Sequence, residues 1–62
     1  MKYKYYKLLD VETGEHVYIN PKYIVFYMRT GNGVLIDFGS KRFIALESDF
    51  EEAMYLDGVE PW

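Results

Sequence analysis

The chain has 62 residues and no cysteine, which excludes disulfides and thiolate metal sites. A domain of this size buries only about 60% of the surface of its unfolded chain, so it depends on dense packing or on a partner. Aromatic residues make up 19% of the sequence, which favours dense packing in a single small domain spanning residues 1–62.

The net charge of −3 is unevenly distributed along the chain. Residues 1–7 contain three lysines and no acid, whereas residues 47–60 contain six acids and no base. Either these two ends lie side by side in one molecule, or they attract one another between molecules, or the acidic end faces a basic partner.

No apolar run approaches the ~20 residues of a membrane helix, and no apolar signal-peptide core follows the lysines at the start. We expect a soluble cytoplasmic protein with no membrane association.

Two strands are predicted in the first third of the chain. Residues 2–10 are rich in tyrosine and leucine, and residues 12–15 form a turn in which Gly14 can take a positive φ. A second strand follows over residues 16–19, with Val17 and Ile19 on one face. Pro21 ends this strand, and the chain turns a corner there.

Three further strands are predicted over residues 23–29, 34–38 and 42–47, joined by turns at 30–33 and 39–40. In this register Asp37 lies across from Arg42. One face holds Val25, Tyr27, Arg29, Val34, Ile36, Phe38, Phe43 and Ala45. The other holds Ile24, Phe26, Met28, Leu35, Ile44 and Leu46.

A helix is predicted over residues 48–57. Ser48 and Glu51 form a capping box, an apolar stripe follows on the helix, and Gly58 is placed to end it.

Both faces of the central strands are mostly apolar, and one helix of roughly ten residues cannot cover both. The second face must be covered by the N-terminal hairpin or by a second protomer. We therefore predict an α+β, mainly β fold: a strongly bent five-stranded antiparallel sheet approaching a small barrel, followed by one C-terminal helix.

The residues that could support catalysis have simpler explanations. His16 is the single histidine and suits a surface position, and the paired carboxylates of residues 47–60 are explained by the helix start. No serine has a catalytic constellation, and no glycine lies in a phosphate-loop context. We predict a protein without enzymatic activity, cofactor, metal or small-molecule substrate.

The leading functional prediction is a protein-binding module that associates with itself. The candidate partner-binding residues are Tyr55, Trp62, Glu51, Glu52 and Asp57. Tryptophan is enriched at interfaces, so Trp62 either anchors a partner or folds back onto the core.

Two alternatives remain open. The first strand interleaves cations with aromatic rings, as single-strand nucleic-acid binders do, although the acidic balance of the chain counts against this activity. The residues concerned are Lys2, Tyr3, Lys4, Tyr5, Tyr6 and Lys7. In the other alternative, the acidic C-terminal segment inhibits a nucleic-acid-binding protein, as a small phage protein would.

A series of short motifs is spread over about residues 13–54. The matching pieces are Gly14-Glu15, Val17 to Pro21, Ile24, Val34 to Ile36, Gly39, Glu47-Ser48 and Glu51-Glu52. In these pieces the chain resembles the small flagellar and swarming-motility proteins of the FlbD/SwrD type. The resemblance implies a small non-enzymatic cytoplasmic accessory protein that acts on the flagellar motor. A fainter similarity to LytTR-type DNA-binding domains covers Tyr18 to Leu46.

Overall fold

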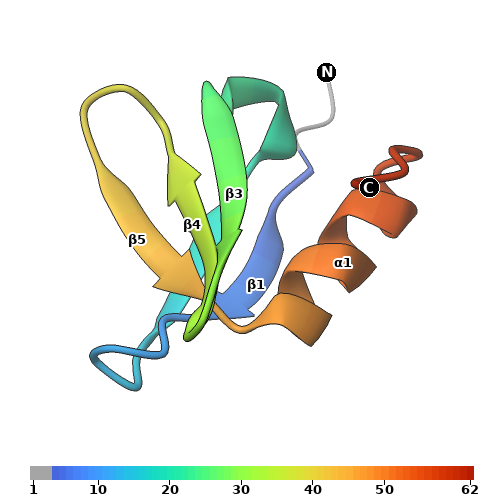
Figure 1. The fold of residues 1–62 in the computed structure, drawn as a ribbon. Coiled ribbons are helices and arrows are strands. Elements are labelled where there is room, and N and C mark those ends of the chain that lie inside the picture. Colours follow the sequence, from blue (N-terminus) through green and yellow to red (C-terminus); the bar gives the residue numbers. More distant parts are fainter. Residues whose placement is uncertain (1–3) are drawn as a thin grey trace.

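The computed structural model describes residues 4–62 (Figure 1). The elements are β1 (Tyr6–Leu9), β2 (His16–Ile19), a 3-10 helix (Pro21–Tyr23), β3 (Phe26–Thr30), β4 (Gly33–Asp37), β5 (Arg42–Ala45) and α1 (Glu47–Leu56). The fold is mainly β with one C-terminal helix, as predicted. In residues 4–62 there is no helix of the length and apolarity that crossing a membrane requires.

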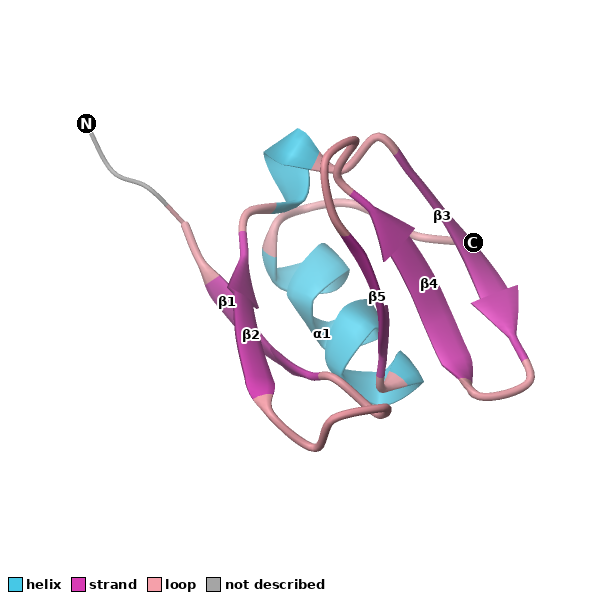
Figure 2. Cartoon of the chain, turned by 90° about the vertical axis from the view of Figure 1, so that its left-hand side faces the viewer, coloured by secondary structure: helices cyan, strands magenta, loops and turns pink. Residues whose placement is uncertain are grey.

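The strands form two antiparallel sheets, β1–β2 and β3–β4–β5, and not the single sheet that we predicted. The sheets meet at one corner, where Asp10 and Ala45 form an isolated bridge and the Leu46 amide donates to the Leu9 carbonyl over 2.9 Å. Beyond this corner β2 and β5 diverge (Figure 2). The predicted continuous sheet approaching a barrel is therefore wrong, because the backbone pairing between β1 and β5 does not extend past their ends.

Within the three-stranded sheet the predicted register is confirmed. Asp37 is the Cα partner of Arg42, and Ile36 pairs with Tyr27 on one side and with Phe43 on the other. The division of side chains between the two faces of this sheet follows directly from that register.

The start of β3 differs from the prediction, because Tyr23 belongs to the 3-10 helix. The Asn20 side chain accepts a hydrogen bond of 3.0 Å from the Lys22 amide and caps this turn. The Ile24 amide then donates to the Pro21 carbonyl over 3.1 Å. These local hydrogen bonds hold residues 20–24 in a turn. β3 therefore begins at Phe26 and not at Tyr23, where the apolar run begins.

The capping box that we predicted at the helix start is not formed. The helix begins at Glu47, its N-cap is Leu46, and no side chain caps it. Ser48 therefore lies inside the first turn. The nearby Asp49 carboxylate instead accepts a hydrogen bond of 2.9 Å from the Leu9 amide, which joins the helix to β1.

The helix end is confirmed. Gly58 has a φ of 82°. The Gly58 amide donates to the Tyr55 carbonyl over 3.0 Å and the Val59 amide to the Met54 carbonyl over 2.8 Å. This is the Schellman arrangement, in which a left-handed residue terminates the helix.

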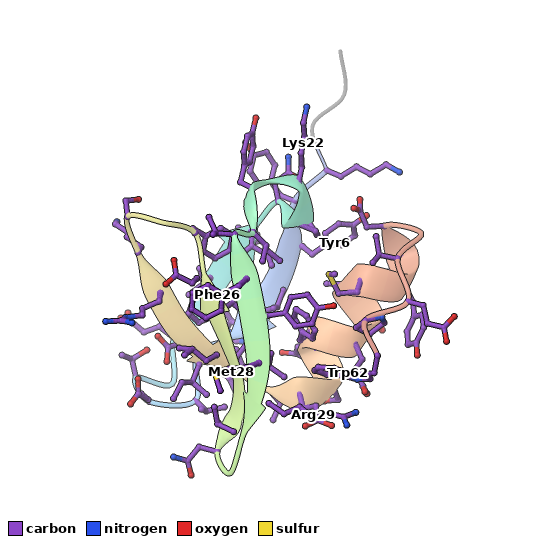
Figure 3. The ribbon with its side chains drawn as sticks, turned by 45° about the horizontal axis from the view of Figure 1, so that its top comes forward. Tyr6, Lys22, Phe26, Met28, Arg29 and Trp62 are labelled. Carbon is purple, nitrogen blue, oxygen red and sulfur yellow. The ribbon has the colours of Figure 1, made fainter. Side chains whose placement is uncertain are left out.

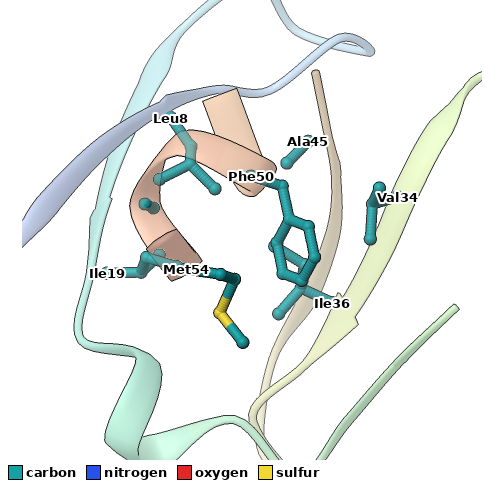
Figure 4. Packing of buried hydrophobic residues seen from close by; sticks show 8 residues of the cluster. Leu8, Ile19, Val34, Ile36, Ala45, Phe50 and Met54 are labelled. Carbon is teal, nitrogen blue, oxygen red and sulfur yellow. The ribbon is translucent and has the colours of Figure 1, made fainter. Parts of the chain in front are cut away.

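The hydrophobic core lies between the two sheets and the helix (Figure 4). It contains Leu8 and Ile19 from the hairpin, Val34, Ile36 and Ala45 from the larger sheet, and Phe50, Ala53 and Met54 from the helix. The hairpin and the helix thus cover the same face of the three-stranded sheet. Our alternative in which the hairpin covers the other face is wrong.

Candidate interaction surface

The opposite face of the three-stranded sheet carries apolar side chains that no element of residues 4–62 covers. We define the outer face as Phe26, Met28, Leu35 and Ile44. Phe26 is 44% exposed and Met28 is 51% exposed, while Leu35 and Ile44 between the strands are partly buried. In Figure 3, Phe26 and Met28 lie on the side of β3 away from α1. Adjacent exposed apolar residues of this kind mark interaction surfaces.

A pair of opposite charges borders the outer face. Asp37 is the Cα partner of both Phe26 and Arg42, so all three share this side of the sheet. In residues 4–62 both ion pairs are formed by Arg29, and Asp37 and Arg42 are not joined by one. The surface therefore combines an apolar centre with one acid and one base at its edge.

These outer-face residues were absent from our candidate site. The alternation of apolar residues in the sequence had already placed them together on one face. That alternation could not say which face the helix covers, so it could not identify them as exposed.

Trp62, a predicted partner anchor, folds back onto the molecule beside α1 and β3 (Figure 3). Its ring lies 5.6 Å from that of Tyr27 and 5.7 Å from that of Phe50. The Arg29 guanidinium carbon lies 3.9 Å from its ring centre, and its indole N–H donates to Glu51 over 2.6 Å. Trp62 remains 42% exposed, but its ring and its donor are both engaged within the chain.

The other candidates on the acidic segment are not gathered into one site. Asp57 accepts a hydrogen bond of 3.3 Å from the Tyr6 hydroxyl, whereas Tyr55 and Glu52 are exposed on the helix. Partial burial, and then the Asp57 carboxylate, raise the pKa of Tyr6 above its usual value of 10.0 because both disfavour a phenolate. The first strand and the acidic segment are therefore neighbours within one molecule.

The candidate nucleic-acid residues of the first strand are divided by the alternation of β1. Lys2 and Tyr3 lie outside the described residues. Tyr6 points toward α1 (Figure 3), whereas Lys7 is exposed on the opposite face beside its Cα partner Tyr18. Lys4 and Tyr5 are exposed before β1 begins. The four of these residues that the structure describes do not form one continuous surface.

Within residues 4–62 no group of three or more His, Cys, Asp or Glu side chains is arranged to hold a metal ion, and His16 is exposed at the start of β2. Comparison with protein families, with curated proteins and with solved structures found no match.

Proposed function

We propose that this chain is a non-enzymatic interaction module that pairs with a second copy of itself through the outer face. The observation that supports this proposal is the exposure of Phe26 and Met28 on a sheet face that neither the helix nor the hairpin covers. Burying apolar surface contributes about 25 cal/mol per Å². A small domain with a limited core gains stability by burying such a face.

Self-complementarity favours a second copy over an unrelated partner. In a two-fold interface each residue meets its counterpart by symmetry, so the surface must match itself in shape and charge. The outer face is bordered by Asp37 and Arg42, which are adjacent across the strands and carry opposite charges. Two copies related by a two-fold axis can place Asp37 of one opposite Arg42 of the other. Phe26 and Met28 belong to residue types that are enriched in interface centres.

An accessory protein of this kind agrees with what the resemblance to FlbD/SwrD-type proteins implies. Such a protein carries no reaction of its own and acts through assembly. The partner on which the assembled form acts is a separate question from the assembly itself.

The test is a comparison of two substitutions of exposed apolar residues. Phe26→Ser removes an aromatic ring from the outer face, and Leu56→Ser removes a 64% exposed side chain from the helix. Both residues are exposed, so neither change leaves a large cavity in the core. Sedimentation of the unmodified chain over a range of micromolar concentrations should show a dimer. Phe26→Ser should raise the dissociation constant at least about tenfold, which corresponds to about 1.4 kcal/mol.

The Leu56→Ser variant should dimerise as the unmodified chain does. Far-ultraviolet circular dichroism checks that both variants remain folded. A chain that sediments as a monomer at every concentration contradicts the proposal. Equal weakening by the two substitutions contradicts the assignment to the outer face.

A further inference from the structure

A second surface feature lies where the two sheets diverge. It is a groove of about 490 Å³ lined by residues of β2, the 3-10 helix and the β4–β5 hairpin. The aromatic residues that line it are Tyr5, Tyr18, Tyr23, Phe38 and Phe43. Phe26 and Met28 do not line this groove, whereas Arg42 both lines the groove and borders the outer face.

The rings in the groove are arranged as surfaces on which a flat group can stack. Phe38 and Phe43 form a parallel pair with ring centres 6.3 Å apart and an interplanar angle of 4°. Tyr18 is 65% exposed and Tyr23 is 57% exposed. Tyr18 is held on the outer side of β2 by its register, and Tyr23 by the 3-10 helix, so backbone structure positions both rings.

The charged side chains that line the groove are positive, in contrast to the chain as a whole, and one acid, Asp37, lies beside them as the Cα partner of Arg42. Lys41 and Arg42 line it, and the described lining residues include no Asp or Glu. Lys7 stands beside Tyr18 as its Cα partner, and Lys22 precedes Tyr23 in the 3-10 helix. Six of the ten acids lie in residues 47–60, and no described residue of that segment lines the groove. The negative net charge therefore does not describe this site.

We infer that this groove binds single-stranded nucleic acid, with bases stacked on its aromatic rings and a phosphate held by Lys41. Exposed aromatic rings beside cations are the combination by which proteins bind single strands without reading their sequence. Charge complementarity favours a polyanion over an uncharged or cationic peptide. The site differs from the linear Lys/Tyr segment that we predicted, because the bend between the sheets supplies rings and cations from five different parts of the chain.

The first test distinguishes the loss of base stacking from the loss of the folded structure. Binding of a fluorescently labelled oligothymidylate of about 12 nucleotides, within the range of site sizes for such proteins, is measured by anisotropy at low salt. Tyr18→Leu should weaken binding at least about fivefold, the lower limit for losing one stacked base. Tyr18→Phe keeps the ring and should bind as the unmodified chain does. Tyr55→Leu alters a 58% exposed tyrosine on the helix and serves as the matched control.

The second test measures the electrostatic contribution to oligonucleotide binding. The logarithm of the binding constant should fall linearly with the logarithm of the salt concentration, and Lys41→Gln should reduce the slope by about 0.7, the value for one phosphate contact on a single strand. Lys41 and Tyr18 lie outside the outer face, so these variants should dimerise normally if the proposed self-association is correct.

Three results would overturn the inference. The first is that the unmodified chain does not bind the oligonucleotide at low salt. The second is that Tyr55→Leu and Tyr18→Leu weaken binding equally. The third is that the chain binds an acidic or proline-rich peptide in a Tyr18-dependent way and does not bind the oligonucleotide. The last result would assign the groove to a protein partner.

Discussion

At the scale of single residues, Gly33 is the clearest case of a residue fixed by its surroundings. A Cβ atom built there would clash with the Ala45 carbonyl oxygen and would lie 3.1 Å from a side-chain carbon of Ile44. Its φ of 150° is also one that L-residues rarely adopt. Only a residue without a side chain lets β4 and β5 approach this closely at the start of β4.

Gly33→Ala should therefore lower the free energy of unfolding by about 2 kcal/mol or more, because the obstacle is backbone that cannot rotate away. Gly31→Ala, two residues earlier in the same turn, is the control. Its Cβ meets no atom within 4 Å and its φ is ordinary, so it should be neutral or stabilising by about 0.4–1 kcal/mol. Urea denaturation measures both values, and equal stabilities of the two variants would show that the close approach is not rigid.

At the scale of elements, the C-terminal tail joins α1 to β3 through Trp62. The ring contacts Phe50 of the helix and Tyr27 of the strand, and the Tyr27 hydroxyl donates to the Pro61 carbonyl over 2.7 Å. Arg29 adds a cation–π contact and ion pairs of 3.8–3.9 Å to two helix carboxylates. The pairs are partly exposed, so the stabilisation comes mainly from the rings.

Trp62→Ala should lower the free energy of unfolding by about 1–3 kcal/mol through lost ring burial and the cation–π contact. Tyr55→Ala removes the ring of a more exposed helix residue, 58% exposed against 42% for Trp62, and should change stability by less than about 0.5 kcal/mol. Thermal unfolding followed by circular dichroism compares them. Should Trp62→Ala prove as stable as Tyr55→Ala, the ring is free to serve as a partner anchor.

The parts of the fold that the sequence predicted correctly are those determined by residues close together in the chain. The register of β3–β4–β5 follows from side-chain alternation and short turns, and the end of α1 follows from Gly58. The start of α1 was misplaced because the helix begins at Glu47 with Leu46 at its N-cap, so Ser48 lies in the first turn and does not cap it. The groove was missed because Tyr18 and Phe38 line it from different sheets, and no pairing rule describes how the two sheets diverge.

At the scale of the whole molecule, the hairpin and the helix both cover one face of the larger sheet, and no element of residues 4–62 covers the other. The sequence indicated two apolar faces and one helix, and the structure assigns the hairpin to the face that the helix already covers. The stability of such a domain should therefore depend on its own concentration, because a dimer that covers the outer face is favoured by mass action.

The midpoint of thermal unfolding should rise with protein concentration. A tenfold increase adds about 1.4 kcal/mol per dimer, or about 0.7 kcal/mol per chain, to the free energy of unfolding of a dimer that unfolds to monomers. For a domain of this size that change corresponds to a rise of roughly 3–6 °C. Differential scanning calorimetry at several concentrations measures it. Phe26→Ser should shift this dependence to protein concentrations at least about tenfold higher, whereas Leu56→Ser should leave it unchanged. A midpoint of the unmodified chain that is independent of concentration would show that the chain is a stable monomer with its outer face exposed to water.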